Sequence, residues 1–237
     1  MQTVLFDLDG TLLAADQETF LKAYFEIMAE SAVKHQIDPK PLIETIWTGT
    51  RAMVANDGNR TNEVVFWELF NRHYPGDSDK ARDMLDEFYI KDFPRVGKTA
   101  TPHPLALKCV ALLKEKGYQV ALATNPLFPR IATEYRIRWA GLSPRHFAHI
   151  TTYENSSYSK PNLAYYRELL ASLGSEPATA LMVGNDVAED MVVESMGMKT
   201  FLLTDHLINP GAVDIGRFPR GGFEELYQMI EGLPFLE

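Results

Sequence analysis

Two aspartates separated by one residue, Asp7 and Asp9, directly follow a short apolar segment near the start of the chain. Two carboxylates in one turn can share a divalent cation, or one can attack an electrophile while the other transfers a proton. Gly10 permits a tight turn, and the backbone N–H groups beside it can cradle phosphate oxygens. Thr11 adds a hydroxyl group to the same turn. This segment therefore suits phosphate chemistry, which requires an aligned nucleophile and neutralisation of charge.

The same residues have two other interpretations. An ordinary polar turn explains the composition without any chemistry. A calcium-binding loop would need further oxygen ligands at alternate positions and a glutamate at the twelfth. Leu12 and Leu13 interrupt that pattern, so we discard the calcium loop. The ordinary turn stays open on the evidence of this motif alone.

Further polar residues follow segments that we predict as strands or precede predicted helices. Thr124 ends an apolar stretch and offers a hydroxyl and a backbone N–H to a phosphoryl oxygen, while Lys160 supplies a compact cation before a helix. Asp186 and Asp190 add carboxylates after another strand. Each has a structural alternative, namely a capping threonine, a solvated lysine and an acid-rich loop. Their occurrence together and in this order is a more specific signal than any one of them.

Helices and strands alternate along the second part of the chain. Repeated strand–helix units form a parallel sheet that is covered by helices on both faces. We therefore predict an α/β fold with a Rossmann-like core, in which ligands gather at the carboxyl ends of the strands. We expect strands at 4–6, 118–123, 147–151, 180–183 and 198–203, and helices at 104–116, 131–139, 162–173 and from about 223.

A stretch of helical patterns interrupts this alternation. Asp16 can cap a first helix, and the stretch shows no convincing strand. We therefore predict an all-helical insertion at residues 16–95, between the two parts of an α/β core that comprises residues 1–15 and 96–237. Further helical patterns follow Pro41, Thr61 and Ser78.

Several side chains of the insertion bear on substrate binding. Arg51 is a candidate contact for a second anionic group of a substrate, although a surface arginine is the more common situation. Four aromatic residues are expected to form the core of the insertion rather than a binding site. These are Trp47, Phe66, Trp67 and Phe70.

The composition restricts the class of protein. A hydrophobic fraction of 46% and a charged fraction of 23% are ordinary for a globular domain. The net charge of -9 argues against nucleic-acid binding, and no apolar run approaches the length of a membrane span. Cys109 is the only cysteine, and the N-terminus lacks a basic, apolar leader. We expect a cytoplasmic protein that binds a small metabolite, as a monomer or simple homodimer, with Cys109 as a buried structural thiol.

Four segments together resemble the motifs of the haloacid dehalogenase-like hydrolase superfamily. The helical insertion is similar to the α-helical cap that this superfamily places after its first strand. The resemblance implies that Asp7 attacks phosphorus and forms an aspartyl-phosphate. It also implies that Asp9 protonates the leaving alcohol and then deprotonates the water that hydrolyses the intermediate. The segments are DLDGT at 7–11, ATN at 123–125, SKPN at 159–162 and GNDVAED at 184–190.

The resemblance further implies a Mg²⁺ ion, bound by Asp7, the backbone carbonyl of Asp9 and an acid of the last motif. Many relatives have Gly-Asp where this chain has Gly-Asn, at 184–185. If Asn185 fills the first position of the motif, Asp190 becomes the acid that binds the metal and Asn185 a weaker, neutral ligand. We favour Asp186 as the direct or water-mediated ligand, with Asp190 supporting Lys160 or the metal shell. The phosphate-binding residues that we expect are Asp7, Gly10, Thr11, Thr124, Asn125 and Lys160.

Asp9 separates the possible reactions. Dehalogenases of this superfamily lack the second acid because a halide leaves without a proton, so its presence favours phosphate chemistry. We expect a Mg²⁺-dependent phosphatase that acts on a small phosphorylated metabolite. Two alternatives stay open, namely a sugar phosphomutase and a non-catalytic module that binds phosphate or a partner.

Overall fold

The computed structural model describes residues 1–236. The strands of its main sheet are β1 (Thr3–Phe6), β4 (Gln119–Leu122), β5 (Ala180–Gly184), β6 (Lys199–Leu203) and β7 (Arg220–Gly221). They lie in the order β4-β1-β5-β6-β7, and each neighbouring pair is parallel. The predicted parallel sheet is confirmed. β7 was not predicted, because two residues are too few to show a strand pattern.

Helices cover both faces of this sheet. They are α5 (Pro104–Glu115), α7 (Leu163–Leu173) and α8 (Phe223–Glu231). Side chains of β1 alternate between the two faces, as the pleat of a strand requires. Val4 and Phe6 pack in a cluster with α5 and α8, whereas Leu5 packs with α7. The alternation confirms the layered α/β architecture.

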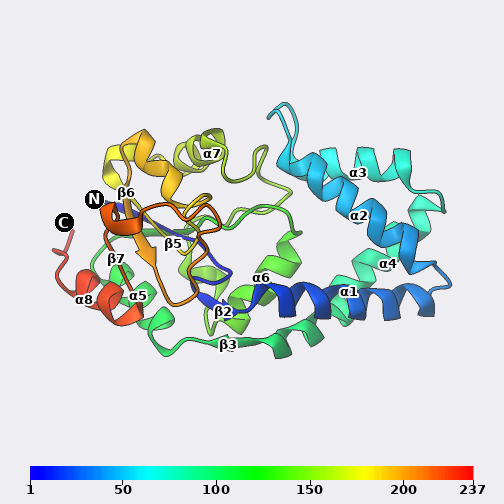
Figure 1. The fold of residues 1–237 in the computed structure, drawn as a ribbon, viewed down its shortest axis with the longest axis horizontal. Coiled ribbons are helices and arrows are strands. Elements are labelled where there is room, and N and C mark those ends of the chain that lie inside the picture. The colour runs from blue at the N-terminus through cyan, green and yellow to red at the C-terminus, as the bar shows by residue number, and fades with distance from the viewer. Residues whose placement is uncertain (237) are drawn as a thin grey trace.

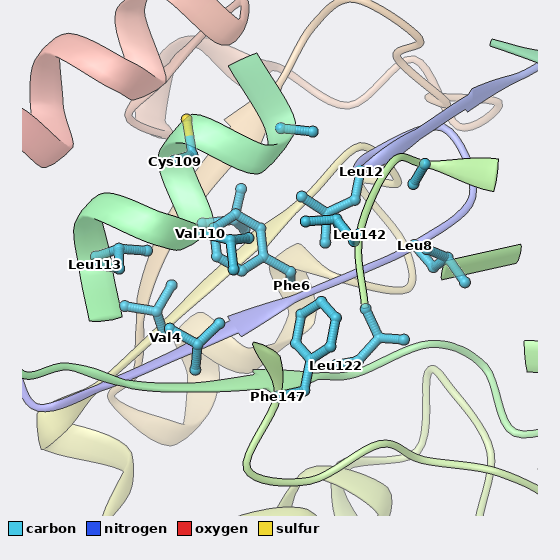
Figure 2. Close-up of a cluster of buried hydrophobic side chains, with 14 of the residues drawn as sticks. Val4, Phe6, Leu8, Leu12, Cys109, Val110, Leu113, Leu122, Leu142 and Phe147 are labelled. Atoms are coloured by element: carbon cyan, nitrogen blue, oxygen red, sulfur yellow. The ribbon is translucent and has the colours of Figure 1, made fainter. Parts of the chain in front are cut away.

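The apolar cluster that lies between β1 and α5 contributes to the core of the α/β part (Figure 2). Val4, Phe6, Val110 and Leu113 are fully buried there, and full burial of such a side chain contributes about 1.5–3 kcal/mol. Cys109 lies in the same cluster, where burial raises the pKa of its thiol to about 12. Cys109 is fully buried, as predicted.

A group of helices occupies the opposite end of the molecule from the sheet (Figure 1). They are α1 (Gln17–Lys34), α2 (Pro39–Val54), α3 (Asn62–His73), α4 (Ser78–Lys91) and the 3₁₀ helix Phe93–Thr99. Each α-helix begins after a side chain that accepts a hydrogen bond from a backbone N–H of its first turn, and these caps are Asp16, Asp38, Thr61 and Asp77. The predicted helical insertion is confirmed. Across residues 1–236, no helix is both long and apolar enough to cross a bilayer.

Two short strands connect this helical group to the core. β2 (Leu13–Ala15) pairs with β3 (Ala100–Pro102) in antiparallel register. Neither was predicted, because three residues are too few to show an alternating pattern. Phe93 and Val96 are fully buried in the apolar cluster of the helical group. The exact boundaries at residues 15 and 95 stay a prediction.

α6 (Arg130–Trp139) lies between the two ends of the molecule. Ala132 belongs to the apolar cluster of the helical group, and Ile137 belongs to the cluster beneath the sheet. α6 therefore couples the helical group to the core.

The predicted strand at 147–151 is an extended segment that pairs with β4 through one parallel bridge, between Leu122 and Ile150.

Candidate active site

The carboxyl ends of three adjacent strands bring the polar motifs together. Asp7 directly follows β1, and its N–H donates to the Val183 carbonyl of β5 at 2.9 Å. Ala123 continues β4 by donating to the Phe6 carbonyl at 2.7 Å, so Thr124 follows on the other side of Asp7. A pocket of about 620 Å³ opens at this edge, and we call it the acidic pocket. Its polar and charged lining residues, with Gly10, are Asp7, Asp9, Gly10, Asp16, Gln17, Glu18, Thr124, Asn125, Arg136, Asn185, Asp186, Glu189, Asp190 and His206.

Lys160 joins two of these carboxylates from a buried position. Its Nζ donates to Asp7 Oδ1 at 2.8 Å and to Asp190 Oδ1 at 2.6 Å, and the side chain is 1% exposed. Burial alone would lower the pKa of Lys160, but the carboxylates of Asp190 and Asp7 raise it well above its usual value. Lys160 therefore keeps its charge and fixes one oxygen of Asp7.

Asp190 is engaged through both of its carboxylate oxygens. Oδ1 accepts from Lys160, and Oδ2 accepts the backbone N–H of Asp186 at 3.0 Å. Burial raises the pKa of Asp190 to about 7, and the charge of Lys160 opposes this rise. Gly184 is required beside it, because a Cβ at that position would overlap the Asp190 carboxylate. These contacts support our expectation that Asp190 supports Lys160.

Asp9 pairs with Arg136, a residue of α6 that the motifs did not point to. The Arg136 guanidinium contacts the Asp9 carboxylate, donates to Thr133 Oγ1 at 3.1 Å and lies 4.6 Å from the centre of the Phe128 ring. Arg136 is 2% exposed, whereas the Asp9 side chain is 40% exposed. Desolvation in the cleft raises the pKa of Asp9, the Arg136 charge opposes the rise, and the Asp7 charge adds to it. Asp9 is thus held on one side and open to the pocket on the other.

The sequence does contain a signal for Arg136. It stands one helical turn from Ala132 and one turn from Ala140, and both alanines are buried. An arginine on the apolar stripe of a helix needs a buried partner, because an unpaired charge there is costly. The pattern does not identify Asp9 as that partner, which lies 127 residues away in sequence.

Asn185 and Thr11 brace the turn that carries the two aspartates. The Thr11 hydroxyl donates to Asn185 Oδ1 at 3.0 Å, and Asn185 Nδ2 donates to the His206 carbonyl at 2.7 Å. Both side chains are 1% exposed. Gly10 has a φ of 78°, and a Cβ there would overlap the Asn185 amide. Thr11 therefore bonds within this brace, whereas Gly10 lines the acidic pocket. The contact of either residue with phosphate stays a prediction.

Asn125 connects the second motif to two others. Its Oδ1 accepts the Lys160 N–H at 3.3 Å, and its Nδ2 donates to the Glu189 carboxylate at 3.2 and 3.3 Å. Burial raises the pKa of Glu189, which also lines the acidic pocket. Glu189 lies inside the last motif but was not singled out from the sequence. Thr124, 2% exposed, lines the pocket beside Asn125.

Arg51 and the four aromatic residues singled out in the helical insertion do not line the acidic pocket, unlike most of those singled out in the core motifs. Arg51 is exposed on α2 and does not belong to the residues that line the acidic pocket. Its contact with a second anionic group stays a prediction. Phe70 is fully buried, as expected for the core of the insertion, but Trp47 is 40% exposed. Trp47, Phe66 and Trp67 also line a separate pocket.

The donor groups fit a Mg²⁺ ion. Within residues 1–236, no three His, Cys, Asp or Glu side chains converge as a ready-made metal cage. Mg²⁺ usually keeps several waters and takes one or two carboxylates together with substrate phosphate. Among the bonds of the described residues, Asp7 and Asp186 each use one carboxylate oxygen, whereas Asp190 uses both. Asp7 and Asp186 therefore suit a hard cation better than Asp190 does.

Known proteins resemble this chain in sequence and in fold. Residues 1–192 match the family model of the haloacid dehalogenase-like hydrolases. Pyrophosphatase PpaX of Bacillus pumilus is 23% identical over 200 residues, which cover 84% of this chain and 82% of the relative. Phosphoglycolate phosphatase of Aquifex aeolicus is 26% identical over 204 residues, with coverage of 85% and 84%.

A 2-haloacid dehalogenase from Pseudomonas syringae pv. Tomato has the same fold. Its solved structure superposes with a TM-score of 0.64 at 20% identity and covers 98% of this chain and 97% of its own. The family match extends from the first strand through the last acidic motif and therefore includes every core motif residue. The chain belongs to the haloacid dehalogenase-like hydrolases.

Proposed function

We propose that this hydrolase is a Mg²⁺-dependent phosphatase that uses Asp7 as its nucleophile and acts on a small phosphorylated metabolite. The observation that carries the proposal is the position of Lys160, whose Nζ bonds both Asp7 and Asp190 at the edge of the acidic pocket. A buried cation fixes the aspartate at the strand end and offsets negative charge where a phosphoryl group would bind. Two curated relatives are named as phosphatases, which supports the same chemistry.

In the first step an oxygen of Asp7 forms a bond to phosphorus while the bond from phosphorus to the alcohol oxygen breaks. Asp9 gives its proton to that oxygen, so the alcohol leaves neutral. The raised pKa of Asp9 favours the protonated form that this step needs. In the second step Asp9 takes a proton from water, whose oxygen attacks phosphorus and releases inorganic phosphate. Asp7 returns as a carboxylate and Asp9 as an acid, so both groups are regenerated.

The other residues at the acidic pocket bind the phosphoryl group and the metal ion or hold Asp7 in position. Lys160 holds Asp7 in place, and we assign Thr124 and the backbone at Gly10 to the phosphoryl oxygens. Asp7, Asp186 and the Asp9 carbonyl are the groups that we assign to Mg²⁺. When bound, this ion neutralises charge on the phosphoryl group.

We also propose that residues 16–95 act as a cap over the acidic pocket. The paired β2 and β3 strands provide two connections to the core, an arrangement that lets a domain open for exchange and close to exclude water. Gln17 at the start of α1 already lines the acidic pocket. The cytoplasmic location and the monomeric or dimeric state stay predictions from the sequence.

Phosphate release from p-nitrophenyl phosphate and acetyl phosphate tests the proposal, with and without Mg²⁺. We expect metal-dependent turnover that disappears in Asp7→Asn. An Asp186→Asn variant should need a higher Mg²⁺ concentration for half-maximal activity. Equal activity of Asp7→Asn and wild type would contradict the mechanism. Phosphate binding without turnover across a broad panel would favour the binding module, and phosphoryl transfer between sugar phosphates would favour the phosphomutase.

A further inference from the structure

A second pocket of about 560 Å³ lies where helices α1 to α4 meet the loop 127–129 and the start of α6. We call it the aromatic cavity. Its volume falls within the range of pockets that bind small molecules. Six of its lining side chains are aromatic residues of the helical group, namely Tyr24, Phe25, Trp47, Phe66, Trp67 and Tyr89.

The wall of the aromatic cavity is apolar and nearly without charge. Among the described residues that line it, Asp86 alone carries a formal charge. The hydroxyls of Tyr24 and Tyr89 bond each other at 2.9 Å, and burial raises the pKa of both, so they stay neutral and paired. A second phosphate or carboxylate would meet no lining cation here, and burying an unpaired charge is costly.

The aromatic cavity adjoins the acidic pocket through shared walls. Gln17, Leu127 and Phe128 line both. The Phe128 ring lies 4.6 Å from the Arg136 guanidinium, which contacts Asp9, and its centre lies 5.6 Å from that of Tyr24. A ligand that spans the two pockets therefore passes Phe128 within a short distance of the group assigned as the general acid.

We propose that the aromatic cavity binds the alcohol part of the substrate, and that this part is uncharged and largely apolar. The substrate class is then a phosphate monoester with one phosphate and an apolar or aromatic body. This inference rests on the proposed function for the phosphate end and adds the identity of the other end. It sets this chain apart from relatives named for pyrophosphate and phosphoglycolate, whose second group is anionic.

A series of linear alkyl monophosphates tests the proposal directly. Ethyl, butyl and hexyl phosphate share the phosphate and a primary alcohol as leaving group but differ in apolar length. Each methylene that enters an apolar cavity should raise kcat/KM about two- to fourfold. We therefore expect kcat/KM for hexyl phosphate to exceed that for ethyl phosphate by at least about tenfold. The kcat/KM for hexyl phosphate should also exceed the values for phosphoglycolate and pyrophosphate.

A pair of variants on one helix localises the effect. Thr50 lines the aromatic cavity, and Thr48 lies on the same helix outside its lining. Thr50→Trp fills part of the cavity and should bring the ratio of kcat/KM for hexyl and ethyl phosphate close to one. Thr48→Trp adds the same side chain elsewhere and should preserve the wild-type ratio.

A flat dependence on chain length, or a preference for pyrophosphate or phosphoglycolate, would overturn the proposed substrate class while leaving the phosphatase in place. Loss of hydrolysis for every phosphate ester, and for acetyl phosphate as well, would instead overturn the proposed function. In that case a binding experiment tests the proposed cavity independently of turnover. The probe is hexylphosphonate, and its binding is followed by tryptophan fluorescence. If hexylphosphonate binds more tightly than ethylphosphonate, and this difference disappears in Thr50→Trp, the result supports the proposed role of the aromatic cavity. Equal binding of the two phosphonates contradicts it.

Discussion

The Arg136 guanidinium contacts the carboxylate of Asp9 from a buried position, while the Asp9 side chain keeps 40% of its surface exposed. One carboxylate oxygen is thereby anchored to α6, and the remaining surface faces the acidic pocket. The arrangement suits a group that must give up a proton and take one back without changing its position. Arg136 is thus a positioning residue for Asp9.

Replacing Arg136 with methionine removes the charge that opposes the raised pKa of Asp9. The pKa of Asp9 then rises further. In the proposed mechanism ionised Asp9 accepts a proton from water, so the acidic limb of the pH profile of kcat should move to higher pH. Arg136→Lys keeps a positive charge and should shift the limb less. Profiles from pH 4 to pH 9 at saturating Mg²⁺ measure the difference. An unmoved limb in Arg136→Met would rule out this role.

Lys160→Met should be costly for both stability and activity. The substitution leaves the carboxylates of Asp7 and Asp190 buried without their cation, which costs about 3–5 kcal/mol in free energy of unfolding. We expect kcat to fall by about 10²-fold or more, because the anchor of Asp7 is lost. The double variant Lys160→Met/Asp190→Asn should regain part of the stability but none of the activity.

Urea denaturation and steady-state kinetics measure these changes. Lys108→Met on α5 provides the control, since Lys108 is exposed and distant from the acidic pocket. If Lys160→Met were as stable and as active as Lys108→Met, the buried ion pairs would have no role in either property.

Gly10→Ala should damage the site through backbone geometry alone. Gly10 has a φ of 78°, and a methyl group there would overlap the Asn185 amide that braces Thr11. Gly174→Ala is a matched control, because Gly174 has a φ of 62° but nothing within 4 Å of an added Cβ. In both variants the free energy of unfolding should fall by about 1–2 kcal/mol, because a residue with a Cβ is strained in the left-handed conformation. A larger loss, together with reduced kcat/KM, is expected for Gly10→Ala only.

Asp190 should make the stability of the metal-free protein depend on pH. Burial raises its pKa from 3.8 to about 7, so ionising it disfavours the folded state. The stability that protonated Asp190 contributes to the folded state is fully present below the unfolded pKa of about 4, and it is lost as the pH rises to about 7. With a chelator present, the free energy of unfolding of wild type should therefore fall relative to that of Asp190→Asn across this interval. Parallel curves for the two proteins would contradict the assignment.

Much of the core was predictable from local patterns. β1 and β5 are short apolar runs that end at chemistry-bearing residues, and parallel neighbours must bring those ends together. The caps Asp16 and Thr61 also mark helix starts by residue type alone. The family match covers the same motifs and confirms the fold and the superfamily.

The remaining features depend on contacts that no local pattern encodes. The pairing of Arg136 with Asp9 arises only when α6 packs beside the β1 turn. Trp47 lines a cavity because of the way α2 meets the loop that carries Phe128, although its spacing on the helix is equally compatible with a closed core. Thr11 is a candidate phosphate contact by type, yet the fold directs its hydroxyl to Asn185.

In the proposed mechanism the phosphoryl group is bonded covalently to Asp7 before its release. Asp9→Asn should retain attack on acetyl phosphate, whose leaving group needs no proton, but should release the intermediate slowly for lack of a base. Quenching such a reaction with borohydride reduces an aspartyl-phosphate to homoserine, and mass spectrometry of the peptides locates it. We predict homoserine at position 7, dependent on Mg²⁺ and absent from Asp7→Asn/Asp9→Asn. An unmodified residue 7 in an enzyme that releases phosphate, or homoserine at the position of another aspartate, would rule out Asp7 as the nucleophile.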